Sequence, residues 1–205
     1  MTRIVFDFAG VLFGWQPTKL LRRCLPARAT DEASARRWEA AIFQGYGGDW
    51  GEFDRGTVSA AELVRRIASR TGLGRHEVQA VVDAVPAELQ PLPESVALLR
   101  RLRKAGHSLY FLSNMPEPYA AHLEREHDFV GWFDAGVFSA RVQFNKPEPR
   151  IFELAAQRFE APPASLVFID DVPLNVQAAR AAGWQALHFR DATTCEIELR
   201  ENGWA

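Results

Sequence analysis

The sequence predicts an α/β fold in which a parallel sheet carries helices on both faces. Short apolar runs rich in β-branched and aromatic residues recur at residues 4–6, 108–112, 136–138, 166–169 and 185–189, which is the pattern of strands covered on both sides. Helical patterns lie between most of these runs. Strands that alternate with helices imply right-handed crossovers, and therefore a mostly parallel, doubly wound sheet.

The clearest helical pattern covers residues 93–107. Pro93 suits a first helical turn, Leu99 and Leu102 share one face with Val96, and Gly106 fits the C-terminal stop. Residues 148–159 and 173–183 predict two more helices, and a last helix is expected on the flank of the sheet after residue 191.

Residues 15–90 differ, because they contain helical patterns at 17–25, 32–44, 59–71 and 75–85 and no convincing strand. Within them, the stretch GYGGDWGEFDRGT at 45–57 has five glycines and predicts an irregular, mobile loop. We therefore expect two domains. A core of residues 1–14 and 91–205 holds the sheet, and an all-helical cap of residues 15–90 is inserted over its mouth.

Composition narrows the class of protein. The chain has 205 residues, 47% of them hydrophobic, and a net charge of −2, which suits a globular domain with an insertion and lacks the basic surface that nucleic acids require. The first apolar run is broken by Asp7 and resembles neither a signal peptide nor a membrane span. Cys24 and Cys195 fit no metal-ligand spacing and are expected to be free thiols. These features predict a cytoplasmic protein without nucleic-acid or membrane partners.

Polar residues lie at or near the ends of the predicted strands: Asp7, Ser113, Asn114, Lys146, Asp170 and Asp171. Taken one at a time, each of these residues could simply stabilise a turn, cap a helix or carry a charge at the surface. Together they should meet at one edge, because ligands of parallel sheets bind at the carboxyl ends of the strands. Three converging carboxylates repel one another unless cations neutralise them. Lys146 supplies one charge, and Mg²⁺, which binds through one or two carboxylates and a substrate phosphate, would supply the rest.

Four segments in order carry a resemblance to a known family. They are DFAGV at 7–11, FLSN at 111–114, NKPEPRIFE at 145–153 and FIDD at 168–171. Each stands at a predicted strand end or just before a helix. In this respect the whole chain resembles the haloacid dehalogenase superfamily of hydrolases, which implies a Rossmann-like core, a cap, and chemistry through an aspartyl intermediate.

The resemblance implies a role for each matching residue. Asp7 would be the nucleophile and a metal ligand, and Gly10 would permit the tight turn that follows it. Ser113 and the backbone at Asn114 would bind the transferring group, and Lys146 would bridge the phosphate and the nucleophile. The Mg²⁺ ligands implied are Asp7, the carbonyl of Ala9, Asp170 and Asp171.

Ala9 departs from the family pattern. Most phosphatases of the family have a second aspartate there, which protonates the leaving oxygen, and such general acid–base catalysis is typically worth ~10²–10⁴-fold. A branch with a small helical cap, a Lys-Pro-Glu third motif and an Arg-Gly-x-x-Ser-like stretch also lacks this acid, and the corresponding cap stretch here is EFDRGTVSAAEL at 52–63. That branch includes phosphatases of sugar phosphates such as glucose 1-phosphate. We therefore predict a Mg²⁺-dependent phosphomonoester hydrolase for a small phosphorylated metabolite such as a sugar phosphate, working as a monomer or homodimer.

Two alternatives stay open. Haloacid dehalogenases of the superfamily also lack the second aspartate and dispense with metal, although the acidic pair of FIDD departs from their pattern. The fold could also serve as a binding or regulatory module with weakened catalysis, against which stands the retention of Asp7, Lys146 and both acids. Mg²⁺ affinity separates the dehalogenase from the other two.

Cap residues should set specificity. Phe13 and Trp15 either wall the substrate or, as we favour, pack into a hinge. Tyr46, Asp49, Trp50 and Arg55 lie in the glycine-rich stretch, where an aromatic ring with polar groups would suit a sugar. No histidine lies at a strand end where it could replace the missing acid. Asn175 either hydrogen-bonds the acidic loop or caps its own helix.

Overall fold

A computed structural model describes residues 2–205 and contains a five-stranded parallel sheet in the order β3-β2-β1-β4-β5. The strands are β1 (Arg3–Phe6), β2 (Ser108–Ser113), β3 (Ala135–Phe138), β4 (Leu166–Asp170) and β5 (Gln185–His188). The chain winds outward from the central β1 in both directions. The predicted doubly wound, Rossmann-like sheet is therefore confirmed, with all five strands where the apolar runs placed them.

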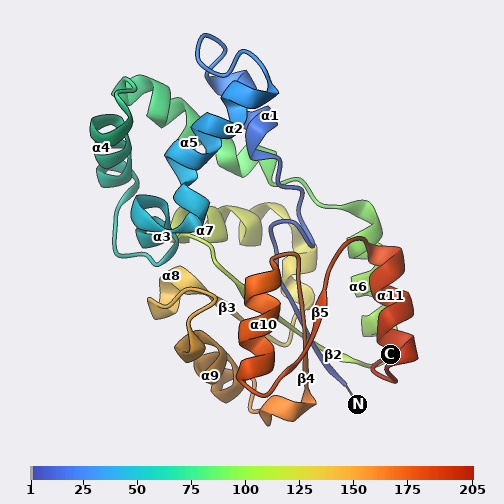
Figure 1. Ribbon diagram of the computed structural model, residues 1–205. Helices are drawn as coiled ribbons and strands as arrows, with labels where there is room; N and C mark the ends of the chain where they lie inside the picture. The colour runs from blue at the N-terminus through green and yellow to red at the C-terminus, as the bar shows by residue number, and fades with distance from the viewer. Residues whose placement is uncertain (1) are drawn as a thin grey trace.

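Each face of the sheet buries its own apolar core, because successive strand residues point to opposite sides. Ile4 and Phe6 of β1 pack on one side with α6 (Pro93–Lys104), α7 (Glu117–Glu126) and α11 (Ala192–Glu201). Val5 packs on the other with α9 (Pro149–Arg158) and α10 (Pro173–Ala181). Figure 1 shows α9 and α10 together on one side of the sheet and α6 beside α11. The shorter helical segments of the core are α8 (Ser139–Val142), η2 (Asp128–Trp132) and η3 (Pro163–Ser165).

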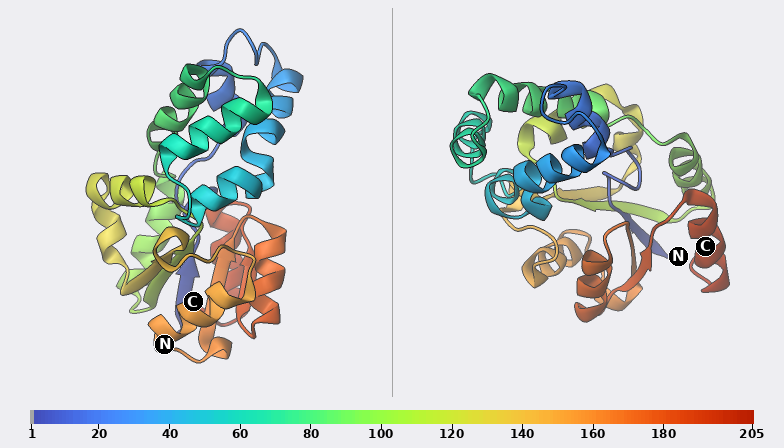
Figure 2. Two further views of the ribbon diagram at one scale, coloured as in Figure 1. Left: turned by 90° about the vertical axis from the view of Figure 1, so that its left-hand side faces the viewer. Right: turned by 45° about the horizontal axis from the view of Figure 1, so that its top comes forward.

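The insertion after β1 is helical, as predicted. It contains α1 (Pro17–Cys24), α2 (Glu32–Phe43), η1 (Gln44–Tyr46), α3 (Gly48–Asp54), α4 (Ala60–Thr71) and α5 (Arg75–Glu88). In both views of Figure 2 these helices form a group of their own beside the sheet. The chain segments that enter and leave the group run side by side, with Gly14 N–H donating to the Gln90 carbonyl and Leu92 N–H to the Leu12 carbonyl, each at 2.8 Å. The boundaries of the core and the cap at residues 14/15 and 90/91 stay a prediction.

The glycine-rich stretch at 45–57 is not the irregular loop that its composition predicted. Most of it forms η1 and α3. Trp50 and Phe53, one helical turn apart, bury their side chains to 3% and 2% exposure. The burial of two aromatic side chains outweighs the low helix propensity of the glycines.

Cys24 and Cys195 are both free, as predicted. Within residues 2–205, none of the helices combines the length and the apolar character needed to cross a bilayer.

Candidate active site

The predicted polar residues meet at the carboxyl edge of the sheet. Asp7 follows β1, Asp170 ends β4, and one carboxylate oxygen from each of these and from Asp171 lies within 4.8 Å of the others. Ser113 and Lys146 line the same cavity as Asp7 and Asp171, which has a volume of about 400 Å³. Four segments far apart in the sequence therefore contribute to one site.

Lys146 lies at the centre of this group. Its Nζ lies 2.9 Å from Asp7 Oδ1 and 2.6 Å from Asp170 Oδ2, and the residue is 4% exposed. The Asn114 side chain holds the Lys146 backbone, accepting from its N–H at 2.8 Å and donating to its carbonyl at 2.9 Å. The Asn114 side chain thus positions the lysine, a contact that the sequence did not predict.

The charges of the site shift its proton equilibria. Burial raises the pKa of Asp7 to about 7, Lys146 opposes this shift, and Asp170 and Asp171 add to it. Burial alone would lower the pKa of Lys146, but its attraction to Asp170 and Asp7 outweighs burial, so that its pKa is raised. Lys146 is therefore a permanent cation here. One such cation among three carboxylates leaves the cluster short of positive charge.

The two acids of β4 are held differently. Asp170 is fully buried and accepts hydrogen bonds from Val172 N–H at 2.8 Å and from the Asn175 amide at 3.1 Å. Asn175 therefore contacts the acidic loop, the first of its two predicted roles. The Asp171 side chain forms no ion pair within residues 2–205, and burial and Asp170 raise its pKa against the effect of Lys146.

Gly10 makes room for the Asp171 carboxylate. Its φ is +83°, and a Cβ built on it would lie 2.2 Å from Asp171 Oδ2. Other residues rarely adopt this φ, and a side chain here would displace the Asp171 carboxylate from its position in the cluster. The tight turn predicted at Gly10 is present, and it serves the acidic cluster as well as the chain direction.

Two further predicted residues border the cavity. Ser113 is 1% exposed, and its Oγ has no hydrogen-bond partner within the part of the chain that the structure describes. A buried hydroxyl without a partner costs free energy, which a ligand atom in the cavity would recover. Ala9 also lines the cavity and presents only a methyl group there.

The cap closes the cavity with fewer polar groups than its sequence predicted. Trp15, Tyr46 and Trp50 line it, whereas Phe13 is completely buried. The preferred hinge-packing interpretation is therefore confirmed for Phe13. Trp15 fits both interpretations, because it packs against the core and also lines the cavity, where its indole N–H donates to the Tyr46 hydroxyl at 2.6 Å.

Two polar cap residues point elsewhere. Asp49 pairs with Arg70 at 3.0 Å, and Arg55 pairs with Glu148 at 2.6 Å. Neither lines the cavity that holds Asp7. The polar groups that we expected to suit a sugar are therefore largely engaged in contacts of their own.

Apolar side chains that the sequence analysis did not single out surround the mouth of the cavity. Of the four large hydrophobic residues that are exposed within residues 2–205, three line this cavity, at 38% (Tyr46), 40% (Val172) and 57% exposure (Leu174). Exposed apolar groups gathered at one place usually mark a binding surface. The rest of the apolar lining is formed by Val85, Leu89, Met115, Pro116 and Tyr119.

A fourth carboxyl group, that of Asp54, was also missed. It lines the same cavity from the cap and is 5% exposed. It was overlooked because residues 45–57 were interpreted as a loop. The available signal was its spacing of four from Trp50, which on a helix places the Asp54 carboxyl on the same face as that aromatic residue.

The chain is similar in sequence to proteins of known function. The chain is 28% identical over 201 residues to the sesquiterpene phosphatase astK of Aspergillus oryzae, covering 96% of this chain and 94% of that protein. It is 33% identical over 120 residues to the fructose-1-phosphate phosphatase YqaB of Escherichia coli, covering 58% of this chain and 62% of that one. The second match therefore spans less than two thirds of its relative.

Solved structures share the fold. A haloacid dehalogenase family enzyme from Bacteroides thetaiotaomicron, crystallised with magnesium and inorganic phosphate, superposes with a TM-score of 0.73 at 19% identity over 95% of this chain and 98% of that one. The L-2-haloacid dehalogenase RSc1362 superposes with a TM-score of 0.70 at 22% identity over 91% and 85%. A sequence model of the haloacid dehalogenase-like hydrolases matches residues 1–183. With this match over most of its length and with this fold, the chain belongs to the haloacid dehalogenase-like hydrolases.

Proposed function

We propose that this hydrolase is a Mg²⁺-dependent phosphomonoesterase that works through an aspartyl-phosphate on Asp7. The observation that supports this most is the cluster of Asp7, Asp170 and Asp171 oxygens within 4.8 Å of one another beside a single buried lysine. A site that binds a haloacid carboxylate without metal gains nothing from three carboxylates, whereas a site for a metal and a phosphate needs them.

The residues present fit a magnesium ion. Mg²⁺ prefers oxygen ligands and is usually bound through one or two carboxylates together with substrate phosphate. Asp7, Asp171 and the Ala9 carbonyl would hold it, with Asp170 holding it directly or through water. When bound, it would neutralise phosphate charge and lower the pKa of Asp7 from the value of about 7 that burial imposes.

Each side chain of the site then has a separate part in the reaction. Phe8 N–H at 2.7 Å and Lys146 Nζ at 2.9 Å fix Oδ1 of Asp7, so that the carboxylate is oriented before substrate arrives. The unpartnered Ser113 hydroxyl would donate to a phosphoryl oxygen, and Lys146 would bind a second one while it stays paired with Asp7. Attack by Asp7 on phosphorus expels the alcohol, and water then hydrolyses the acyl phosphate.

For the substrate, we propose the monophosphate of an apolar alcohol. The cap side of the cavity is formed by Trp15, Trp50, Val85 and Leu89, and Leu174 extends the apolar surface outward. A ligand's orientation in such a pocket is set by a few polar groups and its affinity by apolar contact. The similarity to a sesquiterpene phosphatase over nearly the whole chain supports the same choice. A sugar phosphate stays the second candidate, supported by the partial match to a fructose-1-phosphate phosphatase.

Phosphate release from a panel of esters tests the proposal. The panel contains hexyl, geranyl and farnesyl phosphates, glucose 1-phosphate and fructose 1-phosphate, each assayed with Mg²⁺ and with a chelator. We expect Mg²⁺-dependent release that is fastest for the apolar esters and lost in Asp7→Asn. The matched control is Asp128→Asn, which removes an exposed carboxylate outside the cavity.

Each other outcome points to a different function. Preference for the sugar phosphates would overturn the substrate class and keep the chemistry. Halide release from 2-haloacids without metal, together with no phosphate release, would favour the dehalogenase. Uptake of Mg²⁺ without any turnover would favour a binding module.

A further inference from the structure

The Asp54 carboxyl faces the nucleophile's cavity from the opposite domain. Asp54 is the last residue of α3 in the cap, yet it lines the cavity together with Asp7 and Lys146 of the core. It is 5% exposed, and within residues 2–205 its carboxyl forms no hydrogen bond and no ion pair. A buried carboxyl without a partner is costly, and such groups cluster at functional sites.

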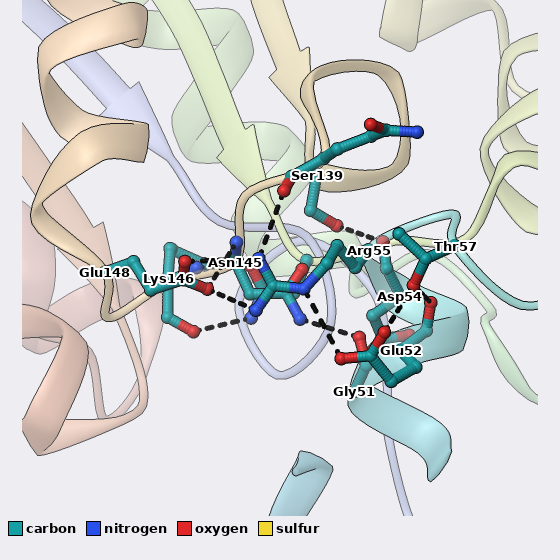
Figure 3. A network of polar contacts seen from close by, with 11 residues as sticks. Gly51, Glu52, Asp54, Arg55, Thr57, Ser139, Asn145, Lys146 and Glu148 are labelled. Carbon is teal, nitrogen blue, oxygen red and sulfur yellow. Dashed lines mark hydrogen bonds and ion pairs between the residues drawn. The ribbon is translucent and has the colours of Figure 1, made fainter. Parts of the chain in front are cut away.

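The backbone around Asp54 is fastened to the core beside the site (Figure 3). The Asp54 carbonyl accepts a hydrogen bond from the Ser139 hydroxyl, whose oxygen in turn accepts from Met115 N–H at 2.9 Å. One turn earlier, the Gly51 carbonyl accepts from the Asn145 amide at 2.8 Å. Asn145 precedes Lys146, and Met115 follows Ser113 and Asn114. These contacts therefore fix the position of Asp54 relative to the two chain segments that would bind phosphate.

Burial favours the protonated form of the Asp54 carboxyl. Burial raises the pKa of the Asp54 carboxyl well above its usual value, and only Lys146 opposes the shift. The other titratable groups that face it are Tyr46 and Tyr119, whose pKa values are raised first by burial and then by nearby carboxylates including Asp54. A neutral carboxylic acid can donate a proton, which the methyl group of Ala9 cannot.

We propose that Asp54 is the general acid of this phosphatase and donates its proton to the leaving oxygen. This inference rests on the proposed function. In phosphoryl transfer the attacking and leaving oxygens lie roughly in line across phosphorus. Because Asp7 attacks from the core, the alcohol departs toward the cap, and α3 of the cap contributes the Asp54 residue to the same cavity.

The proton and the bonds balance over the two steps. In the first, the bond between Asp7 and phosphorus forms, the bond to the ester oxygen breaks, and that oxygen takes the Asp54 proton and leaves as the alcohol. In the second, water attacks the phosphorus of the acyl phosphate and gives a proton to the Asp54 carboxylate. Inorganic phosphate leaves, and both Asp7 and the protonated Asp54 are restored.

The test compares two leaving groups. Hexyl phosphate needs protonation of its leaving oxygen, whereas 4-nitrophenyl phosphate has a stable leaving anion. We expect Asp54→Asn to lower kcat/KM on hexyl phosphate by ~10²–10⁴-fold, the typical value of general acid catalysis, and to leave kcat/KM on 4-nitrophenyl phosphate nearly unchanged. The comparison uses kcat/KM because hydrolysis of the acyl phosphate, in which Asp54 accepts a proton, is common to both esters and enters kcat alone. Asp54→Glu should recover part of the loss. Asp49→Asn, on the same helix but outside the cavity, serves as the matched control and should behave like the wild type.

The outcomes that overturn the inference are distinct. Equal losses of kcat/KM on both esters, or no loss on either, would each show that Asp54 is not the acid. A thermal melt of Asp54→Asn separates loss of the proton from loss of the fold. A wild type that releases phosphate from neither ester would overturn the proposed function, and this inference with it.

Discussion

Arg55 of the cap forms a bidentate ion pair with Glu148 of the core, with Nη2–Oε1 at 2.6 Å and Nη1–Oε2 at 3.1 Å. Arg55 Nη1 also donates to the Gln143 carbonyl at 3.0 Å. Figure 3 shows this ion pair beside the contacts that fasten Asp54 and Gly51. Together these interactions connect the end of α3 with the segment that carries Lys146, so that the position of the cap and that of Lys146 are coupled.

Replacing Arg55 should therefore loosen the cap. The two side chains are 26% and 37% exposed, so that the pair is partly screened and contributes about 1 kcal/mol at most. We expect Arg55→Ala to cost stability on that scale and to lower kcat/KM, because α3 no longer holds Asp54 over the site. Arg65→Ala, which breaks an exposed pair within α4, is the matched control. Equal kcat/KM in the two variants would contradict the coupling.

Magnesium should stabilise the protein through the acidic cluster. Any ligand that binds only the folded state stabilises it by mass action, which amounts to ~2.7 kcal/mol at a concentration one hundred times Kd. Mg²⁺ at such a concentration should therefore raise Tm. The rise should disappear in Asp171→Asn, whose side chain is the least engaged of the three carboxylates. An unchanged rise in that variant would mean that the ion binds elsewhere. The measurement is a thermal melt of both proteins with Mg²⁺ and with a chelator.

The parts of the structure that the sequence predicted are those with a strong local pattern. Asp7 follows β1, Ser113 and Asp170 end β2 and β4, and Lys146 lies shortly before α9. Parallel topology alone brings such positions to one edge of the sheet. The helix over Gly48–Asp54 could not be predicted in this way, because its glycines argue against a helix and its stability comes from tertiary burial of Trp50 and Phe53.

The apolar mouth of the cavity was hidden for a different reason. Leu89, Met115 and Leu174 come from three separate segments, and each taken alone is an ordinary apolar residue. Only the fold brings them together. The same holds for the Asn114 side chain, whose partner is the backbone of Lys146, 32 residues away in the sequence.

Leu174 tests the substrate class. It is 57% exposed at the mouth of the cavity, and covering a leucine side chain with an apolar ligand is worth roughly 1.5 kcal/mol or more, about tenfold in affinity. Leu174→Asp should raise KM for farnesyl phosphate by about that factor and leave hexyl phosphate less affected. Ile197→Asp removes a similarly exposed apolar side chain, at 50% exposure, on α11 and outside the cavity. A rise in KM of equal size in both variants would mean that the mouth of the cavity does not bind the substrate.

The pH dependence of stability should report the buried Asp54 carboxyl. Folding raises its pKa above the usual 3.8, so that the unfolded chain loses this proton at lower pH than the folded one. Where the folded state binds more protons, the free energy of unfolding falls as pH rises. This contribution is complete below pH 3.8 and is lost as pH rises through the folded-state pKa.

Asp54→Asn lacks this titration, so that its Tm relative to that of the wild type should increase as pH rises from 3.8 through the folded-state pKa of Asp54, in metal-free buffer. Because both proteins share every other titrating group, including Lys146, Tyr46 and Tyr119, the difference isolates Asp54. A difference that stays constant with pH would mean that the carboxyl titrates as it does in the unfolded chain.

Restoring the family's second aspartate gives the last prediction. If Asp54 already donates the proton, Ala9→Asp adds a second acid to a site that has one, and turnover of hexyl phosphate should not increase. In the Asp54→Asn background the same substitution should recover part of the lost kcat/KM, because the added carboxyl lies in the same cavity. A large gain from Ala9→Asp in the wild type would instead show that protonation of the leaving oxygen limits the native enzyme. Steady-state rates on hexyl phosphate for the two single variants and the double variant decide between these outcomes, and the non-additivity of the three values measures how far the two carboxyls perform one task.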